Sequence, residues 1–157
     1  MGQNLGAGKL RRVLKSYGIS LLYSFLAGAL MGVTLVLFGE EFLSLFTNDA
    51  DVAAAGMHRV VIMGYSYMVS AFMDCTIAAS RGLGKSFVPT VIVIMGSCVF
   101  RVVWVYTIFA HFHTIPSLYL LYVFSWTLTA VAEIIYFIKT YRGMVRSAAT
   151  ENTPENG

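Results

Sequence analysis

Four long runs of apolar residues, separated by short polar segments, dominate the chain. They cover residues 17–38, 60–79, 87–109 and 115–138. A helix rises about 1.5 Å per residue, and about 20 residues cross the hydrocarbon core of a bilayer, so each run is long enough to span it. The pattern therefore predicts an all-α integral membrane protein with four transmembrane helices.

The composition agrees with a chain that is surrounded mostly by lipid. Of its 157 residues, 57% are hydrophobic and 12% charged, against about 45–50% and about 25% in typical soluble domains. This excludes a disordered chain. The net charge of +3 does not indicate a nucleic-acid partner, because the basic residues lie in short clusters between the apolar runs. Cys75 and Cys98 lie inside apolar runs without metal-ligand spacing, and we interpret them as packing residues.

Lysine and arginine are distributed unequally over the connecting segments. Nine of the 11 stand before the first run, between the second and third, or after the fourth, whereas the opposite segments hold only Arg59. The positive-inside rule then predicts that both chain ends are cytoplasmic. We divide the chain into a cytoplasmic loop (1–16), a transmembrane segment (17–141) and a cytoplasmic disordered tail (142–157). The first residues do not have the pattern of a signal peptide.

The polar segments contain signals for helix ends. In the longest connection, residues 39–59, apolar residues at 42, 43, 45 and 46 predict a short amphipathic helix at the membrane interface. The following Thr47-Asn48-Asp49 predicts a cap for the second long helix. Two prolines, Pro89 and Pro116, stand in the first turns of the third and fourth runs. Each follows a hydroxyl residue, Ser86 or Thr114, that suits a helix cap.

Polar residues at three- and four-residue spacing form a stripe along each of the last three predicted helices. The stripes are Tyr67, Ser70, Asp74 and Arg81; Thr90, Ser97 and Arg101; and Tyr122, Ser125, Thr129, Glu133 and Tyr136. We expect them to line a shared cavity for a cation or a substrate. The first predicted helix instead has a small residue at every fourth position (Ser24, Gly28 and Gly32), which predicts a close-packing face.

Three ionisable residues lie inside the predicted spans, and each is a candidate functional group because a charge in lipid costs several kcal/mol unless it is paired or hydrated. Counted from the outer end at about 1.5 Å per residue, Arg101 lies about 12 Å deep, Asp74 about 21 Å and Glu133 about 27 Å. Arg101 is therefore poorly placed to pair with either acid. Structural alternatives remain open for all three. Asp74 can hydrogen-bond Tyr67 or Ser70, Glu133 can extend toward Lys139 or water, and Arg101 can bind backbone carbonyls.

Two further patterns are weak evidence for chemistry. Residues 81–86, Arg-Gly-Leu-Gly-Lys-Ser, end like a phosphate-binding loop, but Ala79 stands where its first glycine is required and a transmembrane helix precedes it. His111 and His113 offer only two ligands to a metal. No nucleophile, base and orienting group fall together at one depth, so we expect neither an enzyme nor a cofactor.

Glycines recur in the two predicted inner loops. Gly6 and Gly8 stand in the first, and Gly82 and Gly84 in the second. Glycine adopts positive φ without a steric penalty, so these positions predict tight turns where a short loop reverses the chain.

Three segments resemble the multidrug and toxic compound extrusion (MATE) transporters. Residues 2–9, Gly-Gln-Asn-Leu-Gly-Ala-Gly-Lys, resemble the loop that precedes the third or ninth helix of the family. Residues 80–86, Ser-Arg-Gly-Leu-Gly-Lys-Ser, resemble its inner loop between helices ten and eleven. Residues 100–107, Phe-Arg-Val-Val-Trp-Val-Tyr-Thr, together with Ser125-Trp126, are similar to a bacterial subgroup. The likeness extends to about Tyr141.

This resemblance implies that the four spans are helices nine to twelve of a twelve-helix transporter, that the chain is a carboxy-terminal fragment, and that Met1 is an internal methionine. It implies export of drugs and cationic or amphipathic compounds in exchange for protons or sodium, by alternating access, across the bacterial inner membrane. The implied partners are the missing amino-terminal bundle and membrane lipids. In some members an acid in the helix matching residues 60–79 takes part in cation coupling, and Asp74 is its counterpart here.

Two alternatives stay open. One is a self-standing four-helix membrane subunit or scaffold that oligomerises through Ser24, Gly28 and Gly32. The other is a lipid-linked oligosaccharide flippase of the same superfamily, although Arg101 alone does not make its cavity strongly cationic. Small four-helix drug exporters resemble the chain poorly, because they depend on an acid in the first helix and residues 17–38 have none.

Overall fold

The computed structural model describes residues 1–112 and 115–151, and this part of the chain is helical without strands. The elements in chain order are α1 (Gly2–Gly6), α2 (Leu10–Leu37), α3 (Gly39–Ser44), α4 (Ala50–Gly82), α5 (Phe87–Val93), η1 (Ile94–Val99), α6 (Phe100–Trp104), η2 (Val105–Phe109), α7 (Ala110–Phe112) and α8 (Ile115–Glu151), where η marks a π-helix. Within the described residues four helical stretches are long and apolar enough to cross a membrane: Leu10–Leu37, Ala50–Gly82, Phe87–Phe109 and Ser117–Thr150. The predicted fold class, an all-α membrane protein with four spans, is confirmed.

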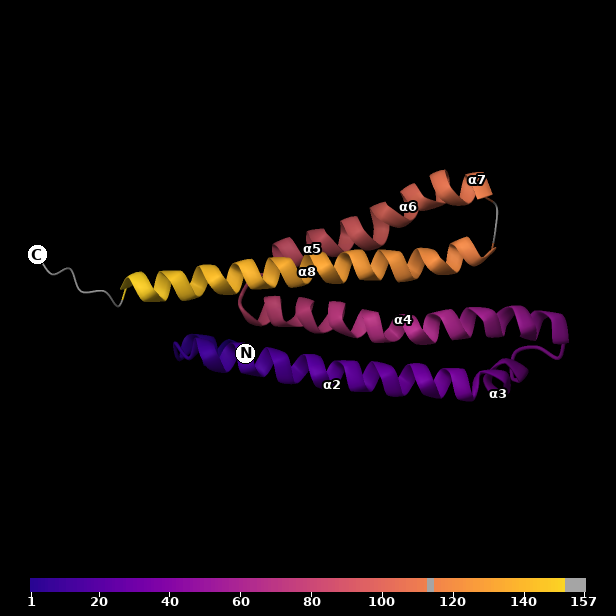
Figure 1. Ribbon diagram of the computed structural model, residues 1–157, viewed down its shortest axis with the longest axis horizontal. Helices are drawn as coiled ribbons and strands as arrows, with labels where there is room; N and C mark the ends of the chain where they lie inside the picture. Colours follow the sequence, from indigo (N-terminus) through magenta and orange to yellow (C-terminus); the bar gives the residue numbers. More distant parts are fainter. Residues whose placement is uncertain (113–114, 152–157) are drawn as a thin grey trace, which may run out of the picture.

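The four spans lie side by side with α4 and α8 in the middle. On one side α2 packs against α4, and on the other the continuous helix from α5 to η2 packs against α8 (Figure 1). The chain reverses direction between α2 and α4 and again before α5 and α8, so α4 and α8 run in the same direction. The start of α2 and the end of α8 therefore lie at the same end of the bundle (Figure 1).

Three helices extend beyond the apolar runs that predicted them. The helix of the first run begins at Leu10 and that of the second at Ala50, and α8 continues to Glu151. Residues 142–151 are therefore helical, unlike the disordered tail that we expected from residue 142. The cause is local: alanine, methionine and arginine favour helix, and no proline interrupts this stretch. Residues 152–157 of the expected tail lie outside the described residues.

Close packing of α2 on α4 depends on glycines. A Cβ atom built on Gly28 would lie 2.9 Å from the Tyr67 carbonyl oxygen, and one built on Gly64 would lie 3.0 Å from the Gly32 carbonyl oxygen. Gly32 meets the Gly64 backbone still more closely. The backbones of the two helices touch at these positions, which confirms the predicted close-packing face at Gly28 and Gly32.

The glycine-containing loops are tight turns, but only one glycine of each pair has the positive φ that we expected. Gly8 has φ 67° and Gly84 has φ 76°. Gly6 and Gly82 are instead the last residues of α1 and α4. The left-handed residue follows the helix end, as is common when glycine terminates a helix.

Replacing Gly8 by alanine should lower stability by about 1–2 kcal/mol, because a left-handed conformation brings Cβ against the following carbonyl. Gly6 is the matched control: a Cβ atom there meets nothing within 4 Å and its φ is not positive. Thermal unfolding of the two alanine variants in detergent measures the difference. Equal midpoints would contradict a steric role for the positive φ.

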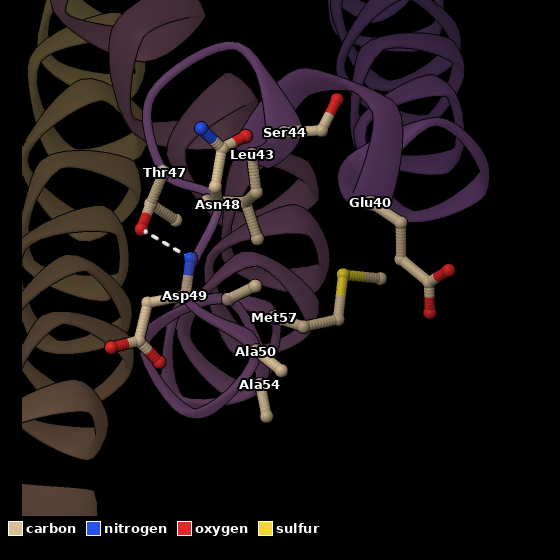
Figure 2. Close-up of a pocket in the computed structure, with 10 residues that line it drawn as sticks. Glu40, Leu43, Ser44, Thr47, Asn48, Asp49, Ala50, Ala54 and Met57 are labelled. Carbon is tan, nitrogen blue, oxygen red and sulfur yellow. Dashed lines mark hydrogen bonds between the residues drawn. The ribbon is translucent and has the colours of Figure 1, made fainter.

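The connection between α2 and α4 contains the short helix that we predicted, α3, followed by a capped start of α4. The Asp49 carboxylate accepts the backbone N–H of Asp51 at 2.9 Å and of Val52 at 3.4 Å. The N–H of Asp49 donates to the Thr47 hydroxyl at 3.1 Å (Figure 2). The predicted cap is thereby confirmed.

The predicted cap of the third span is not formed. Ser86 has helical φ and ψ (−103° and −32°), and its side chain makes no cap hydrogen bond. A capping serine usually adopts an extended backbone, so its hydroxyl is misplaced for this role. The carbonyl of Ser86 instead accepts the Thr90 hydroxyl at 2.8 Å. Thr114, the other expected cap, lies outside the described residues.

Candidate functional site

Buried polar side chains recur on the two central helices, α4 and α8. The buried members are Ser66, Thr76 and Ser80 on α4, and Ser125, Thr129 and Glu133 on α8. Three of the hydroxyls, those of Ser66, Thr76 and Thr129, each donate at 2.7 Å to the carbonyl four residues earlier on the same helix. Such bonds satisfy the hydroxyl proton within one helix, and the Thr76 oxygen also lies 2.9 Å from the Tyr17 hydroxyl of α2.

The buried hydroxyls of α4 were not part of the polar stripe predicted for this helix. Ser66, Thr76 and Ser80 share a helix face with the buried Met73 and Ile77. Small polar and apolar residues that alternate at three- and four-residue spacing could therefore have identified this buried face from the sequence.

Arg101 on α6 is held by residues of α8. Its Nε donates to the Ser125 hydroxyl at 3.2 Å, and that hydroxyl donates in turn to the Gly96 carbonyl at 2.8 Å. The guanidinium lies 4.5 Å from the ring centre of Tyr122 and 5.9 Å from that of Trp126. These cation–π contacts and hydrogen bonds join the third span to α8.

The backbone around Arg101 departs from a regular α-helix, which nothing in the sequence predicted. The π-helices η1 and η2 precede and follow α6, the short helix that bears Arg101. Within η1, a Cβ on Gly96 would collide with the Thr129 hydroxyl, so glycine permits η1 to approach α8 closely. Local π-helices occur frequently at functional sites.

Asp74 lies on the open face of α4. It is exposed, and among the described residues it makes no hydrogen bond or ion pair. Ser70, the expected local partner, donates instead to the Tyr67 carbonyl at 3.1 Å. The structural alternative for Asp74, a hydrogen bond to Tyr67 or Ser70, is therefore not formed.

Most of the polar stripe of α4 is exposed, whereas most of the polar stripe of α8 is buried. Tyr67, Asp74 and Arg81 are seven residues apart and exposed, so they share one open face. On α8, by contrast, Ser125, Thr129 and Glu133 are buried. The described residues alone do not bring the stripes around one shared cavity, because the residues of α4 that face α8 are a different set. Of the α4 stripe, only Tyr67 contacts a residue that surrounds Arg101: its ring centre lies 6.3 Å from that of Trp126.

Glu133 does not extend toward water. Its side chain is 0% exposed, and neither carboxylate oxygen has a hydrogen-bond partner among the described residues. The fully buried Phe137 follows it one turn later on α8, between Glu133 and the end of the helix. The alternative in which Glu133 extends toward Lys139 or water is therefore wrong.

A pocket of about 480 Å³ lies where α3 folds against the start of α4. Figure 2 shows the two acidic residues of its wall, Glu40 and Asp49, on opposite sides, and the Asp49 carboxylate already caps α4. Across residues 1–112 and 115–151 no group of three His, Cys, Asp or Glu side chains is placed to hold a metal ion. His113, half of the weak histidine pair, lies outside the described residues.

The fold and these sites define a multi-pass helical membrane protein with polar groups inside its spans, an arrangement typical of membrane transporters. The MatE family model matches residues 1–107, about two thirds of the chain. The chain therefore belongs to the MatE family, whose members are membrane efflux transporters and not enzymes. The match covers the first two spans and most of the third, and it ends before α8. No curated protein matches the chain.

Proposed function

We propose that this chain is the carboxy-terminal part of a cation-coupled antiporter that exports drugs and other cationic or amphipathic compounds by alternating access. Its four spans then correspond to helices nine to twelve of a twelve-helix transporter. The protein lies in a bacterial inner membrane with both ends cytoplasmic, the side favoured by its lysines and arginines. Membership of the MatE family supports an efflux function.

The observation that carries the proposal is the position of Asp74. It is exposed on a helix that spans the membrane, and it has no partner among the described residues. Carboxylates within spans almost always face the interior of a bundle or a water-filled cavity, because lipid does not solvate them. The open face of α4 is therefore covered by protein or water in the membrane, and the amino-terminal bundle of the transporter is the partner that we propose for it.

Five residues of the site have a role in this mechanism. Asp74 binds the coupling proton or sodium ion, and Ser70, one turn earlier on α4, adds a hydroxyl beside it. Tyr67 offers an exposed ring to an aromatic or cationic drug. Arg101 and Thr129 hold η1 and α6 against α8, so that α8 and the third span move together. Cation binding then shifts the equilibrium between inward-open and outward-open states.

The test is transport by the complete transporter in liposomes. We expect a fluorescent cationic dye to move against its own gradient when an opposing proton or sodium gradient is imposed. Collapsing that gradient with an ionophore should stop the movement. Dye flux that is unaffected by either ion gradient would overturn the coupling, and no flux with any cationic or amphipathic dye would overturn the substrate class.

The scaffold alternative is weakened by the packing of α2. Gly28 and Gly32, the residues that were expected to join subunits, already lie against α4 of the same chain. A second molecule cannot use this face unless α2 and α4 first separate.

A further inference from the structure

A second acidic group, remote from the open face of α4, has no role in the proposed mechanism. Glu133 on α8 is fully buried in the helix bundle, and both of its carboxylate oxygens lack hydrogen-bond partners among the described residues. Within residues 1–112 and 115–151, the Ser80 hydroxyl on α4 is the other buried side-chain oxygen without a hydrogen-bond partner. Ser66 and Thr76 on the same helix bond their own backbone, so the unpartnered Ser80 hydroxyl differs from its neighbours.

The helix register places these two groups at one level of the interface. Ile77 and Ala130 belong to one buried apolar cluster, and Leu83 and Phe137 belong to the next. Since α4 and α8 run in the same direction (Figure 1), the residues three positions after Ile77 and after Ala130 fall between the two clusters. Those residues are Ser80 and Glu133.

A carboxylate anion is poorly suited to this place. An ionised group without hydrogen bonds in an apolar interior is strongly disfavoured and takes up a proton instead. Near Glu133, Arg81 follows Ser80 on α4 and is exposed, and the Tyr17 hydroxyl of α2 is paired with Thr76 at 2.9 Å. The sequences of α5 and η1 contain no charged residue that would neutralise an anion from the other side of α8.

We propose that Glu133 and Ser80 form a proton-binding site between α8 and α4, separate from Asp74. In the conformation described here Glu133 is the neutral acid and makes no hydrogen bond to Ser80, whose hydroxyl lies at the same level and accepts the O–H group of Glu133 once either side chain rotates. Because the site is closed, the proton leaves to water only when the interface of α4 and α8 opens. The resulting anion then faces the positive charge of Arg81 at the end of α4. Protonation therefore stabilises the closed interface, and deprotonation favours the open one.

Infrared difference spectroscopy of the complete protein in lipid tests the site directly. Between neutral buffer, in which exposed carboxylic acids are already ionised, and alkaline buffer we expect the carbonyl stretching band of a protonated carboxylic acid to disappear. This band should be absent in Glu133→Gln, whose amide keeps the size of the side chain. In Ser80→Ala the band should remain but shift in frequency, because the polar hydroxyl at the level of the acid is lost.

Two matched variants separate this proposal from the proposed transport function. Glu41→Gln removes an exposed acid of α3 and should leave the band unchanged. If the band persists in Glu133→Gln and vanishes in Asp74→Asn, the proton site between α4 and α8 is overturned while coupling at Asp74 stands. An unshifted band in Ser80→Ala would remove Ser80 from the site, even if Glu133→Gln failed to fold.

Discussion

Replacing Asp74 by asparagine should abolish ion-coupled transport in the complete transporter while leaving its abundance in the membrane unchanged. Asparagine has nearly the same shape but carries no charge and does not exchange a proton near neutral pH. Asp74 is exposed and is not part of the buried core, so this change should cost the fold little. Drug resistance of cells and gradient-driven dye flux in liposomes are the two measurements.

The same helix provides the control for this variant. Asp51 is an exposed acid in the first turn of α4, outside the apolar run, and Asp51→Asn should retain coupled transport. Asp74→Glu restores the carboxylate and should recover part of the flux. Unaltered drug resistance in Asp74→Asn would remove this residue from the coupling mechanism, and equal losses in both asparagine variants would show that the effect is not specific.

The largest effect on the fold should follow from replacing Gly64 by leucine. A Cβ atom there lies 2.9 Å from the Val36 side chain and 3.0 Å from the Gly32 carbonyl oxygen, so leucine forces α2 and α4 to move apart. Overpacking of a close contact typically costs about 1–3 kcal/mol. We expect a lower yield of folded protein and a reduced midpoint of thermal unfolding in detergent.

Gly18 on α2 provides the matched control, because a Cβ atom there meets nothing within 4 Å. The change Gly18→Leu adds the same side chain to an exposed helix position and should leave the midpoint close to that of the unmodified protein. If Gly64→Leu were as stable as Gly18→Leu, the close contact between α2 and α4 would not contribute to stability.

Features that depend on neighbouring residues in the chain were predictable from the sequence. Runs of apolar residues identify the spans, because the transfer of a helix into lipid depends on its own composition. The cap at Asp49 and the turn at Gly84 likewise depend on a few adjacent residues. The helix ends were less predictable, since hydropathy marks where lipid begins, whereas α4 and α8 continue as helix beyond it.

The candidate site was predicted as a set of residues but not as an arrangement. Spacing placed Asp74 and Glu133 on polar stripes, and we expected both stripes to face one cavity. The structure instead exposes Asp74 and encloses Glu133. The turn pattern of a helix shows which residues share a face, but it does not show which neighbour that face meets.

The sequence by itself determined the four spans, the turns and the chemical groups available within the membrane. Only the tertiary structure decided that α4 and α8 lie in the middle, that Arg101 is held by Ser125 and Tyr122, and that Glu133 is closed off at the level of Ser80. The physical reason is that spans are set by the transfer of each segment into lipid. Their neighbours are set by close contacts between residues far apart in the chain, such as Gly32 with Gly64.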